Sequence, residues 1–498
     1  RRTPRSTLFP YTTLFRSLVL YFPAILVMAQ GIIIRPGAYM TIGTDAYVKT
    51  TGTAGLTLES NPDGTASLLD EDGNLTVSGD LVSQLYIAKN AWHIVSPNTS
   101  GVTALDFYWN DDPQCWLTYH QESDNTWHYN TNLSTSMPLG QGWMVWLDNA
   151  YSGAGATVEM SGALRSDDLS PAISYGGSSW NLTGNPYPCA LDWGDAGWTR
   201  SNVEGTVWIW DNPSNNYLYR TTAGGGTMSN GIIPQGQGFF IKSTGSSPVL
   251  TIPAQARQHS NQDFYKNTES VNGYADYLVL RVSQGIQADA VWVSFGENGS
   301  EGFENGWDAT KLRGGESAPQ LYLPEQGRQQ SINHLYLLSG EEERIVPLNF
   351  KAGTNGEHSL KADASRFTGK TIILDDLQTG QSQYLTENPV YAFQGNVNDP
   401  ADRFRLRFRK ALGVPSSENT AAFVYTFGGE GTVHVRLGNA APQKVTMARV
   451  YSVQGALVGE CPVYPGSDNI LNIPHARGYL IVKVTGADWQ HISKVIVK

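Results

Sequence analysis

Two aspartates at the ends of apolar runs could form a catalytic carboxylate pair. Asp192 follows Cys-Ala-Leu, and Asp211 follows Val-Trp-Ile-Trp. Glycoside hydrolases place two carboxyl groups on either side of the scissile bond, one of them as the general acid. Aspartate at a strand end is more often a turn former, because its carboxylate accepts hydrogen bonds from nearby backbone amides. We therefore predict no catalytic residues here.

Other residues with metal-binding chemistry lack the spacing of known sites. His120 and His128 lie in Trp-rich strand and turn sequence, where an exposed polar role is the simpler interpretation. The run Asp70-Glu71-Asp72-Gly73 could hold calcium, but it lacks the full ligand series of a calcium loop and reads as a hairpin turn. No His-Glu-x-x-His or Gly-x-Ser-x-Gly motif occurs. We expect no metal and no cofactor.

The three cysteines are too few for a disulfide framework. They are Cys115, Cys189 and Cys461. A Cys115–Cys189 bridge could form in an oxidising compartment, and buried free thiols are the alternative.

Tryptophan is the residue type that suggests a ligand. Eleven of the fourteen tryptophans lie between positions 92 and 210. Flat rings can cover the C–H faces of sugars, but they also fill cores, where each buries a large area. We assign Trp92, Trp143 and Trp180 to the core. Trp193 and Trp198, in a Gly-rich loop, are the candidate ligand-binding residues. Trp208 and Trp210 alternate on one strand face, so they are exposed or buried together.

Composition favours a turn-rich β protein that does not bind nucleic acid. Charged residues make up 16% of the 498-residue chain and the net charge is -11. Phosphate binding needs basic surface, so nucleic acid is excluded as a partner. Short alternating or β-branched runs, separated by Gly, Asn, Asp and Pro, indicate strands throughout. We predict an all-β chain of several tandem domains.

An internal repeat marks the middle of the chain. One copy opens with WHIVSP at Trp92 and contains PLGQGWMVWL at 138–147, and the other opens with WNLTGNPYP at Trp180 and contains IPQGQGFFIKS at 233–243. In both, Gly-Gln-Gly precedes an aromatic strand, which suits a tight turn or close backbone approach and not a phosphate loop. The pattern predicts duplicated β modules.

Boundaries follow from the repeat and from composition. Arg403–Arg409 alternates apolar and basic residues, as expected of a half-buried strand whose arginines meet acidic neighbours. The predicted segments are 30–83 (short strands or a partial β-solenoid), 84–170 and 171–262 (the repeats), 263–412 (a β-sandwich), 413–422 (a linker) and 423–498 (a small Ig-like sandwich).

The C-terminal segment resembles the type A sorting domain of the type IX secretion system of Bacteroidetes. The resemblance covers about 75 residues and rests on ARVYSVQGALV at 448–458, LNIP at 471–474, RGYLIVKV at 477–484 and KVIVK at the end. Gly455 and Gly478 match turn glycines of that family. The part of the chain that precedes this segment likewise resembles surface proteins of the phylum. The resemblance implies the secretion machinery as a partner, export to the outer face of the outer membrane, and attachment to surface lipopolysaccharide or release.

The N-terminal residues carry two further expectations. Residues 18–29 resemble a truncated signal peptide, with an apolar run ending in Ala29 before Gln30. TLFPYTTLFRS at 7–17 resembles the translation of a sequencing-library adapter, so we expect residues 1–17 to be an artefact.

Together these features predict a secreted, non-catalytic surface protein with an adhesion or matrix role. The alternative is a carbohydrate-binding or accessory polysaccharide-degradation protein, which would use Trp193 and Trp198. A hydrolase using Asp192 is the third candidate.

Overall fold

The structure is a computed structural model of the chain, and it divides into two compact units, 1–408 and 409–498. It describes residues 7–9, 13–20, 25–108, 115–148, 151, 153–260, 273–336, 343–367, 370–410, 424–428, 430–437, 446–464, 467–486 and 490–497, with backbone alone for 7–9, 13–20, 25–29, 410, 424–428, 446 and 490. The predicted linker 413–422 lies outside these residues. The predicted all-β class is confirmed, because strands take 56% and helices 2% of the structure.

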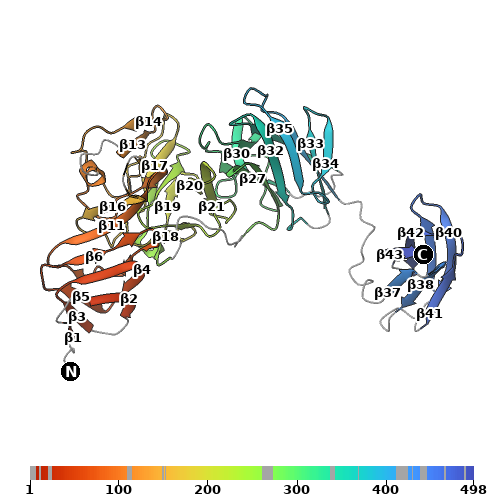
Figure 1. Cartoon of the computed structure of the whole chain (residues 1–498), viewed down its shortest axis with the longest axis horizontal. Coiled ribbons are helices and arrows are strands. Elements are labelled where there is room, and N and C mark those ends of the chain that lie inside the picture. The colour runs from red at the N-terminus through yellow and green to blue at the C-terminus, as the bar shows by residue number, and fades with distance from the viewer. Residues whose placement is uncertain are drawn as a thin grey trace. The chain divides into compact units, whose positions relative to one another are not determined.

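The first unit begins with short strands stacked in parallel (Figure 1). Strand β4 pairs in parallel with β2, β6 and β9, and β5 pairs in parallel with β3 and β10. Alternate residues of β5 point inward, so Ala46, Val48 and Thr50 are buried. These strands are β1 (Thr7–Phe9), β2 (Thr13–Leu20), β3 (Ile25–Ala29), β4 (Ile32–Ile42), β5 (Ala46–Thr50), β6 (Leu56–Leu58), β7 (Ser60–Asn61), β8 (Gly64–Thr65), β9 (Ser67–Asp70) and β10 (Leu75–Thr76).

Two longer strands join this stack to the repeat region. β11 (Leu81–Ala88) pairs in parallel with β6 and antiparallel with β16 (Gly155–Ser161). Every second side chain of β16 is buried, and Val158 and Met160 pack with Leu85 and Ile87 of β11. This pair covers one face of the first repeat sheet, the face that carries Leu117, Val145 and Leu147. We call it the inner face and the opposite one the outer face.

The two repeats form four-stranded sheets of identical topology. The first repeat sheet has the order β12-β15-β13-β14 and the second has the order β17-β23-β20-β21. In each, the strand after Gly-Gln-Gly lies between the opening strand and a hairpin. The bounds are β12 (Trp92–Val95), β13 (Cys115–Gln121), β14 (Thr126–Tyr129) and β15 (Trp143–Leu147), then β17 (Trp180–Gly184), β20 (Thr206–Asp211), β21 (Asn216–Thr221) and β23 (Gly238–Lys242).

The repeat sheets hold each other by reciprocal backbone pairing. Gln237 of the second repeat bridges Val95 of the first, and Gln141 of the first bridges Thr183 of the second. The hydrogen bonds match as well: Ser96 N–H donates to Gly236 O (2.9 Å), and Gly184 N–H donates to Gly140 O (3.1 Å). The two sheets are therefore related by an approximate two-fold axis.

Glycine is required where the two backbones meet. A Cβ on Gly238 would lie 2.5 Å from Ile94 Cγ2 and 3.4 Å from Gly142 Cα, and a Cβ on Gly142 would lie 2.5 Å from Thr183 O. Gly140 and Gly236 have φ of +79° and +68°, which L side chains rarely adopt. The predicted turn and close approach are both present.

Short strands and turns complete the second repeat. Its inner core includes Tyr187, Cys189, Leu191, Ile241 and Leu250. These elements are β18 (Ala190–Asp192), β19 (Thr199–Ser201), β22 (Ile232–Ile233), β24 (Val249–Thr251) and β25 (Arg257–Gln258), with the 3-10 turn η2 (Ala254–Ala256). The other 3-10 turn, η1 (Ala104–Phe107), belongs to the first repeat.

The predicted sandwich, 263–412, is one long sheet that curls around its own core. The last strand of the sheet order meets the third: Phe393 of β35 and Phe404 of β36 have ring centroids 5.0 Å apart. Two halves of the sheet thus enclose one core, as in a sandwich. The strands are β26 (Asp276–Gln284), β27 (Gln287–Gly296), β28 (Ala309–Thr310), β29 (Gln320–Glu325), β30 (Arg328–Tyr336), β31 (Glu343–Lys351), β32 (Gly356–Asp363), β33 (Lys370–Asp376), β34 (Gln381–Tyr384), β35 (Val390–Gly395) and β36 (Phe404–Lys410).

The alternation of β36 confirms the strand predicted at 403–409. Phe404 and Phe408 are buried in the core of the curled sheet. Arg405 and Arg407 each donate to Asp375 at 2.7 Å. The basic face is therefore paired with acid and offers no anion-binding strip.

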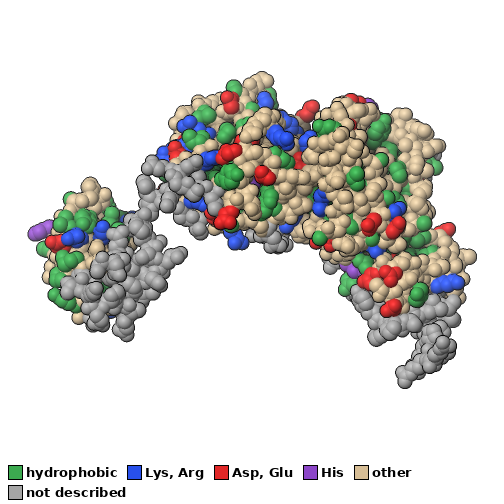
Figure 2. Space-filling model, turned by 180° about the vertical axis from the view of Figure 1, so that it is seen from behind, with side chains coloured by type: hydrophobic (Ala, Val, Ile, Leu, Met, Phe, Trp, Pro, Cys, Tyr) green, Lys and Arg blue, Asp and Glu red, His purple; other side chains and the backbone are tan. Residues whose placement is uncertain are grey.

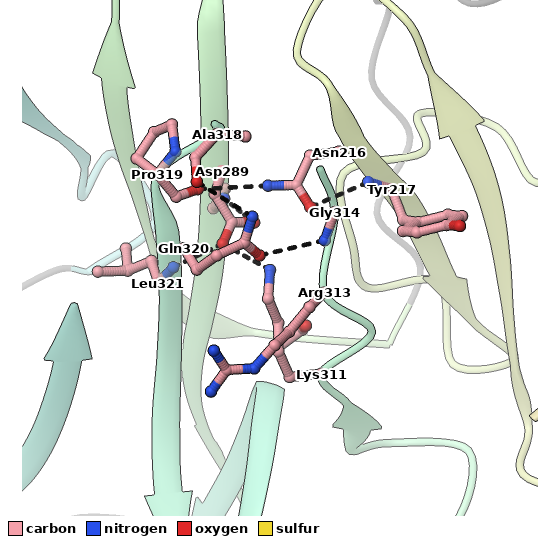
Figure 3. Close-up of polar contacts among 12 residues, drawn as sticks. Asn216, Tyr217, Asp289, Lys311, Arg313, Gly314, Ala318, Pro319, Gln320 and Leu321 are labelled. Carbon is pink, nitrogen blue, oxygen red and sulfur yellow. Dashed lines mark hydrogen bonds and ion pairs between the residues drawn. The ribbon is translucent and has the colours of Figure 1, made fainter. Parts of the chain in front are cut away.

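Buried polar contacts join the second repeat sheet to the curled sheet (Figure 3). Lys311 Nζ lies 2.5 Å from Asp289 Oδ2, and both side chains are about 1% exposed. Asp289 also accepts the N–H of Leu321 at 2.6 Å. Asn216 at the start of β21 donates to the carbonyls of Ala288 and Pro319, at 3.3 and 3.4 Å. The ion pair lies within the curled-sheet segment, where it satisfies two buried charges, and the Asn216 hydrogen bonds are the contacts of this set that cross between the two sheets.

Two further acids are buried at the same joint. Glu204, before β20, accepts Thr310 N–H at 2.7 Å and the Thr310 hydroxyl at 2.8 Å. Asp308 accepts the N–H groups of His334 (2.6 Å) and Glu304 (2.7 Å). Burial raises the pKa of both carboxyls to about 7.

The second unit, 409–498, contains a small sandwich. Among its described residues, the sheets β37-β38-β41 and β40-β39-β42-β43 share one valine-rich core. Gly455 and Gly478 have φ of +85° and +87°, so each occupies a turn that favours glycine. The strands are β37 (Val424–Gly428), β38 (Thr432–Leu437), β39 (Thr446–Ser452), β40 (Leu457–Val463), β41 (Asp468–Asn472), β42 (Gly478–Thr485) and β43 (Gln490–Val497).

All three cysteines are free, so the Cys115–Cys189 bridge considered above is not formed. Cys115 Sγ donates to Phe107 O at 3.0 Å, and Cys189 is fully buried in the core of the second repeat. Burial raises the pKa of both thiols to about 12. In the part of the chain that the structure describes, no helix is both long and apolar enough to cross a membrane.

We predict that Gly238→Ala destabilises the first unit by about 1–3 kcal/mol, the usual cost of overpacking. The added Cβ would meet Ile94 Cγ2 and Val95 O at 2.5 and 2.8 Å. Urea unfolding of the full chain measures the change. Gly302→Ala is the matched control, because its nearest neighbouring atom would lie 3.9 Å away. Equal stability of the two variants would contradict the close approach.

We predict that the buried Glu204 makes the free energy of unfolding of the first unit fall as the pH rises. Its carboxyl has a pKa of about 7 when folded and 4.5 when exposed, so the folded chain keeps a proton that the unfolded chain releases. The free energy of unfolding then falls between about pH 4 and 7 and levels off above. Glu204→Gln should flatten this slope relative to wild type, whereas the exposed Glu316→Gln should not. Parallel slopes for both variants would argue against a buried Glu204.

Candidate functional site

The outer face of the first repeat sheet carries a set of aromatic side chains. Residues directly opposite each other on neighbouring strands share a face. Trp92 is opposite Trp146, and Trp146 is opposite Trp116. Thr118 and His120 lie on the same face as Trp116, because every second residue of β13 points the same way. Tyr129 is opposite Thr118 and Trp127 is opposite His120, so these two rings of β14 also lie on this face. We call Trp92, Trp116, Trp127, Tyr129 and Trp146 the aromatic surface.

Much of this surface is open to solvent. Trp116 is 47% exposed, Trp127 36% and Tyr129 60%, while Trp92 and Trp146 are half-buried. The rings support each other: Trp92 and Trp146 have centroids 5.3 Å apart, and Trp116 and Tyr129 5.4 Å apart. A contiguous patch of large, exposed apolar side chains often marks an interaction site, whereas single exposed apolar residues do not.

The rest of the same face is covered by the second repeat sheet. Ile94 and Met144 pack in one core with Trp180, Trp208 and Phe240. At the border of the cover, Trp127 and His120 contact the Phe240 ring edge-on, at 5.8 and 5.1 Å. Burial at this border lowers the pKa of His120. The second repeat thereby fixes one side of the aromatic surface.

Trp193 and Trp198, the predicted ligand-binding residues, lie in the core of the second repeat. Trp193 is fully buried and Trp198 is 6% exposed. The Arg200 guanidinium lies 4.1 Å from the Trp193 ring centroid, the two indoles are 4.8 Å apart, and Phe239 meets both. A sugar could not stack on either ring without displacing these neighbours. A sugar-binding role would have to rest on other residues.

The remaining tryptophan predictions meet mixed outcomes. Trp143 and Trp180 are buried, as predicted, but Trp92 lies on the half-buried outer face. Trp208 is fully buried while Trp210 is partly exposed, so the two differ in exposure, contrary to the prediction that they are exposed or buried together. The sequence reasoning missed Trp116, Trp127 and Tyr129. Alternation in CWLTYHQ and TWHY could have placed them on one face, but it could not show that this face is uncovered.

The carboxylates and histidines considered as candidate pairs make separate local contacts. Asp192 Oδ1 accepts Gly194 N–H at 2.7 Å, and Asp211 Oδ2 accepts Ser214 N–H at 3.0 Å, so both act in turns. His120 lies on the outer face of its sheet. His128 is opposite Tyr119 on the inner face, where it contacts Asp124 at 2.9 Å. The two imidazoles cannot share a metal ion.

A groove of about 610 Å³ lies between the parallel strands and the second repeat. It is lined by Asp70, Leu75, Asp80, Arg165 and Arg257, among others. Asp70, Arg165 and Arg257 make local hydrogen bonds. The Asp70 carboxylate accepts the N–H groups of Asn74 and Leu75, both at 2.9 Å, which is the turn role considered for 70–73. Arg257 donates to Asp70 O at 2.8 Å. The groove is therefore built mainly by structural contacts.

Charge does not mark a site either. On the face shown in Figure 2, acidic and basic side chains are interspersed among uncharged ones, with no continuous basic stretch. Along the outer face of the first repeat sheet, the positions of β12, β13, β14 and β15 carry no Lys, Arg, Asp or Glu. The aromatic surface is therefore uncharged when His120 is neutral.

The fold defines a multi-domain β protein, and its most distinctive exposed feature is the aromatic surface. The chain belongs to the family described as domain of unknown function DUF8693, whose model matches residues 25–408. The match begins inside the predicted signal peptide, where Ile25–Ala29 forms β3. It ends before the predicted sorting domain, which stays a prediction.

A relative comes from the Bacteroidetes. The minor fimbrium subunit Mfa5 of Porphyromonas gingivalis is 25% identical over 356 residues, covering 65% of this chain and 28% of that protein. The chain thus spans little more than a quarter of its relative's length. This agrees with the predicted resemblance to Bacteroidetes surface proteins. A solved biofilm-associated protein, BSP domain, is 8% identical with a TM-score of 0.13, covering 85% of this chain and 92% of that one. That score is too low to indicate a shared fold.

Proposed function

We propose that this chain is a non-catalytic adhesion protein of the bacterial cell surface. The observation that carries the proposal is the aromatic surface of the first repeat sheet, where Trp116 is 47% and Tyr129 60% exposed. Exposed rings offer large contact area at low entropic cost, because each has only two side-chain torsions. The fimbrium subunit among its relatives supports a structural role at the surface.

The proposal includes export by the type IX secretion system, with that machinery as a partner. It is supported by the small sandwich formed by the described residues of the second unit, and by the positive φ of Gly455 and Gly478, the two glycines that match the family's turns. Surface lipopolysaccharide is the proposed anchor. Carbohydrate binding, the second candidate function, concerns what the aromatic surface contacts.

We predict that the aromatic surface is needed for attachment. Beads coated with the full chain should be retained under flow on biofilm matrix from a Bacteroidetes host, and Trp116→Ala/Tyr129→Ala should lose most of that retention. The matched control is Tyr336→Ala/Tyr384→Ala, which removes two exposed rings of the curled sheet, 56% and 47% exposed. Equal retention of both double variants would refute the proposed role of this surface.

Export is tested separately, by deleting 423–498 in a host that has the secretion machinery. We expect the truncated protein to stay in the periplasm, since its sorting unit is gone, whereas the full chain reaches the surface. Surface labelling of intact cells measures both, with total protein by immunoblot as the control for expression. Surface display of the truncated chain would show that the sorting assignment is mistaken.

A further inference from the structure

The approximate two-fold axis gives every position on one repeat sheet a counterpart on the other. The pairing registers define the counterparts. Those of the aromatic surface are Trp180 for Trp92, Thr206 for Trp116, Tyr217 for Trp127, Tyr219 for Tyr129 and Lys242 for Trp146.

The counterparts on the second sheet are covered. Tyr219 is 1% exposed and donates its hydroxyl to Ala290 O of β27 at 2.8 Å. Thr206 is fully buried beside the carbonyl of Asp308. The curled sheet thus covers this area of the outer face of the second repeat sheet. The equivalent area of the first repeat sheet is the aromatic surface. No described residue covers it, because Trp116 and Tyr129 are exposed.

The open surface differs from its covered counterpart in chemistry. The covered sheet has Thr206 and Lys242 at two of these positions. Thr206 and the nearby Glu204 contact the curled sheet through Asp308 O and Thr310, whereas Lys242 donates to Ser178 O within its own repeat. The open sheet instead has Trp116 at the position of Thr206, so a ring replaces the hydroxyl that contacts the curled sheet.

The shape is a row across the strands. Trp92, Trp146 and Trp116 lie opposite one another on three neighbouring strands, and Tyr129 is on the fourth. With neighbouring strands about 4.8 Å apart, the row is roughly 14 Å long. That length suits an extended chain of several rings better than a single small molecule. Exposed Thr131 and Asn132 follow Tyr129 and supply hydrogen-bonding groups at its end.

We propose that the aromatic surface binds a neutral polysaccharide chain laid across β12, β15, β13 and β14. Indole and phenol rings pack against the C–H faces of successive sugars, and polar side chains at the border meet their hydroxyls. Because the strand positions of this face carry no Lys or Arg, they offer no cationic partner for the carboxylates or sulfates of acidic glycans. This inference rests on the proposed function, since it names the ligand class of the same surface.

The test is affinity electrophoresis of the full chain in gels containing a neutral polysaccharide. The probes are a β-glucan, an arabinoxylan and a galactomannan, with polygalacturonate and alginate as acidic comparisons. We expect retardation by at least one neutral polysaccharide. Trp116→Ala/Tyr129→Ala should weaken the dissociation constant by about ten-fold or more, and Tyr336→Ala/Tyr384→Ala should leave it unchanged.

Folding and ligand class are controlled separately. Trp116→Phe keeps a flat ring and should retain part of the affinity, which a merely misfolded variant would not. Binding to none of the neutral probes, or to the acidic ones alone, overturns the inference. If the bead attachment described above still falls in Trp116→Ala/Tyr129→Ala, the surface contacts a protein and the adhesion proposal stands. If attachment is also unchanged, both proposals fail.

Discussion

The first unit depends on the reciprocal pairing of two Gly-Gln-Gly segments. Each segment lies against the opening strand of the other repeat, so Val95 pairs with Gln237 as Thr183 pairs with Gln141. Gly238 and Gly142 meet so closely that a side chain on Gly238 would be 3.4 Å from the other's Cα. Neither sheet can shift without breaking the hydrogen bonds that both Gly-Gln-Gly segments make with the opposite repeat.

This pairing brings the two outer faces together over only part of their area. Where they overlap, Ile94, Met144 and Phe240 exclude water. The remainder of each face must be covered by something else or stay exposed. On the second repeat the curled sheet covers it, with a polar network around Asp289 and Lys311. On the first repeat it carries the aromatic surface. Duplication therefore produced two equivalent positions with different chemistry.

Much of the fold could be predicted from the sequence, because strand signals are local. Period-two alternation placed Phe404 and Phe408 inward and Arg405 outward, and the structure pairs that arginine with Asp375. The repeated Gly-Gln-Gly motif indicated a close backbone approach, since only glycine tolerates one. The parallel stacking of β4 and β6 brings together residues far enough apart in the chain that composition could suggest it but not give its register.

The candidate site shows the limit of that reasoning. Sequence alone determined that the chain is all-β, that its middle is duplicated, and that tryptophan gathers there, because these depend on residue type, spacing and repetition. Which tryptophans face solvent was decided by tertiary structure. Trp193 stands in a glycine-rich loop but is enclosed by Arg200, Trp198 and Phe239. Trp116 stands in a strand but remains open, because burial depends on which distant segment covers a face.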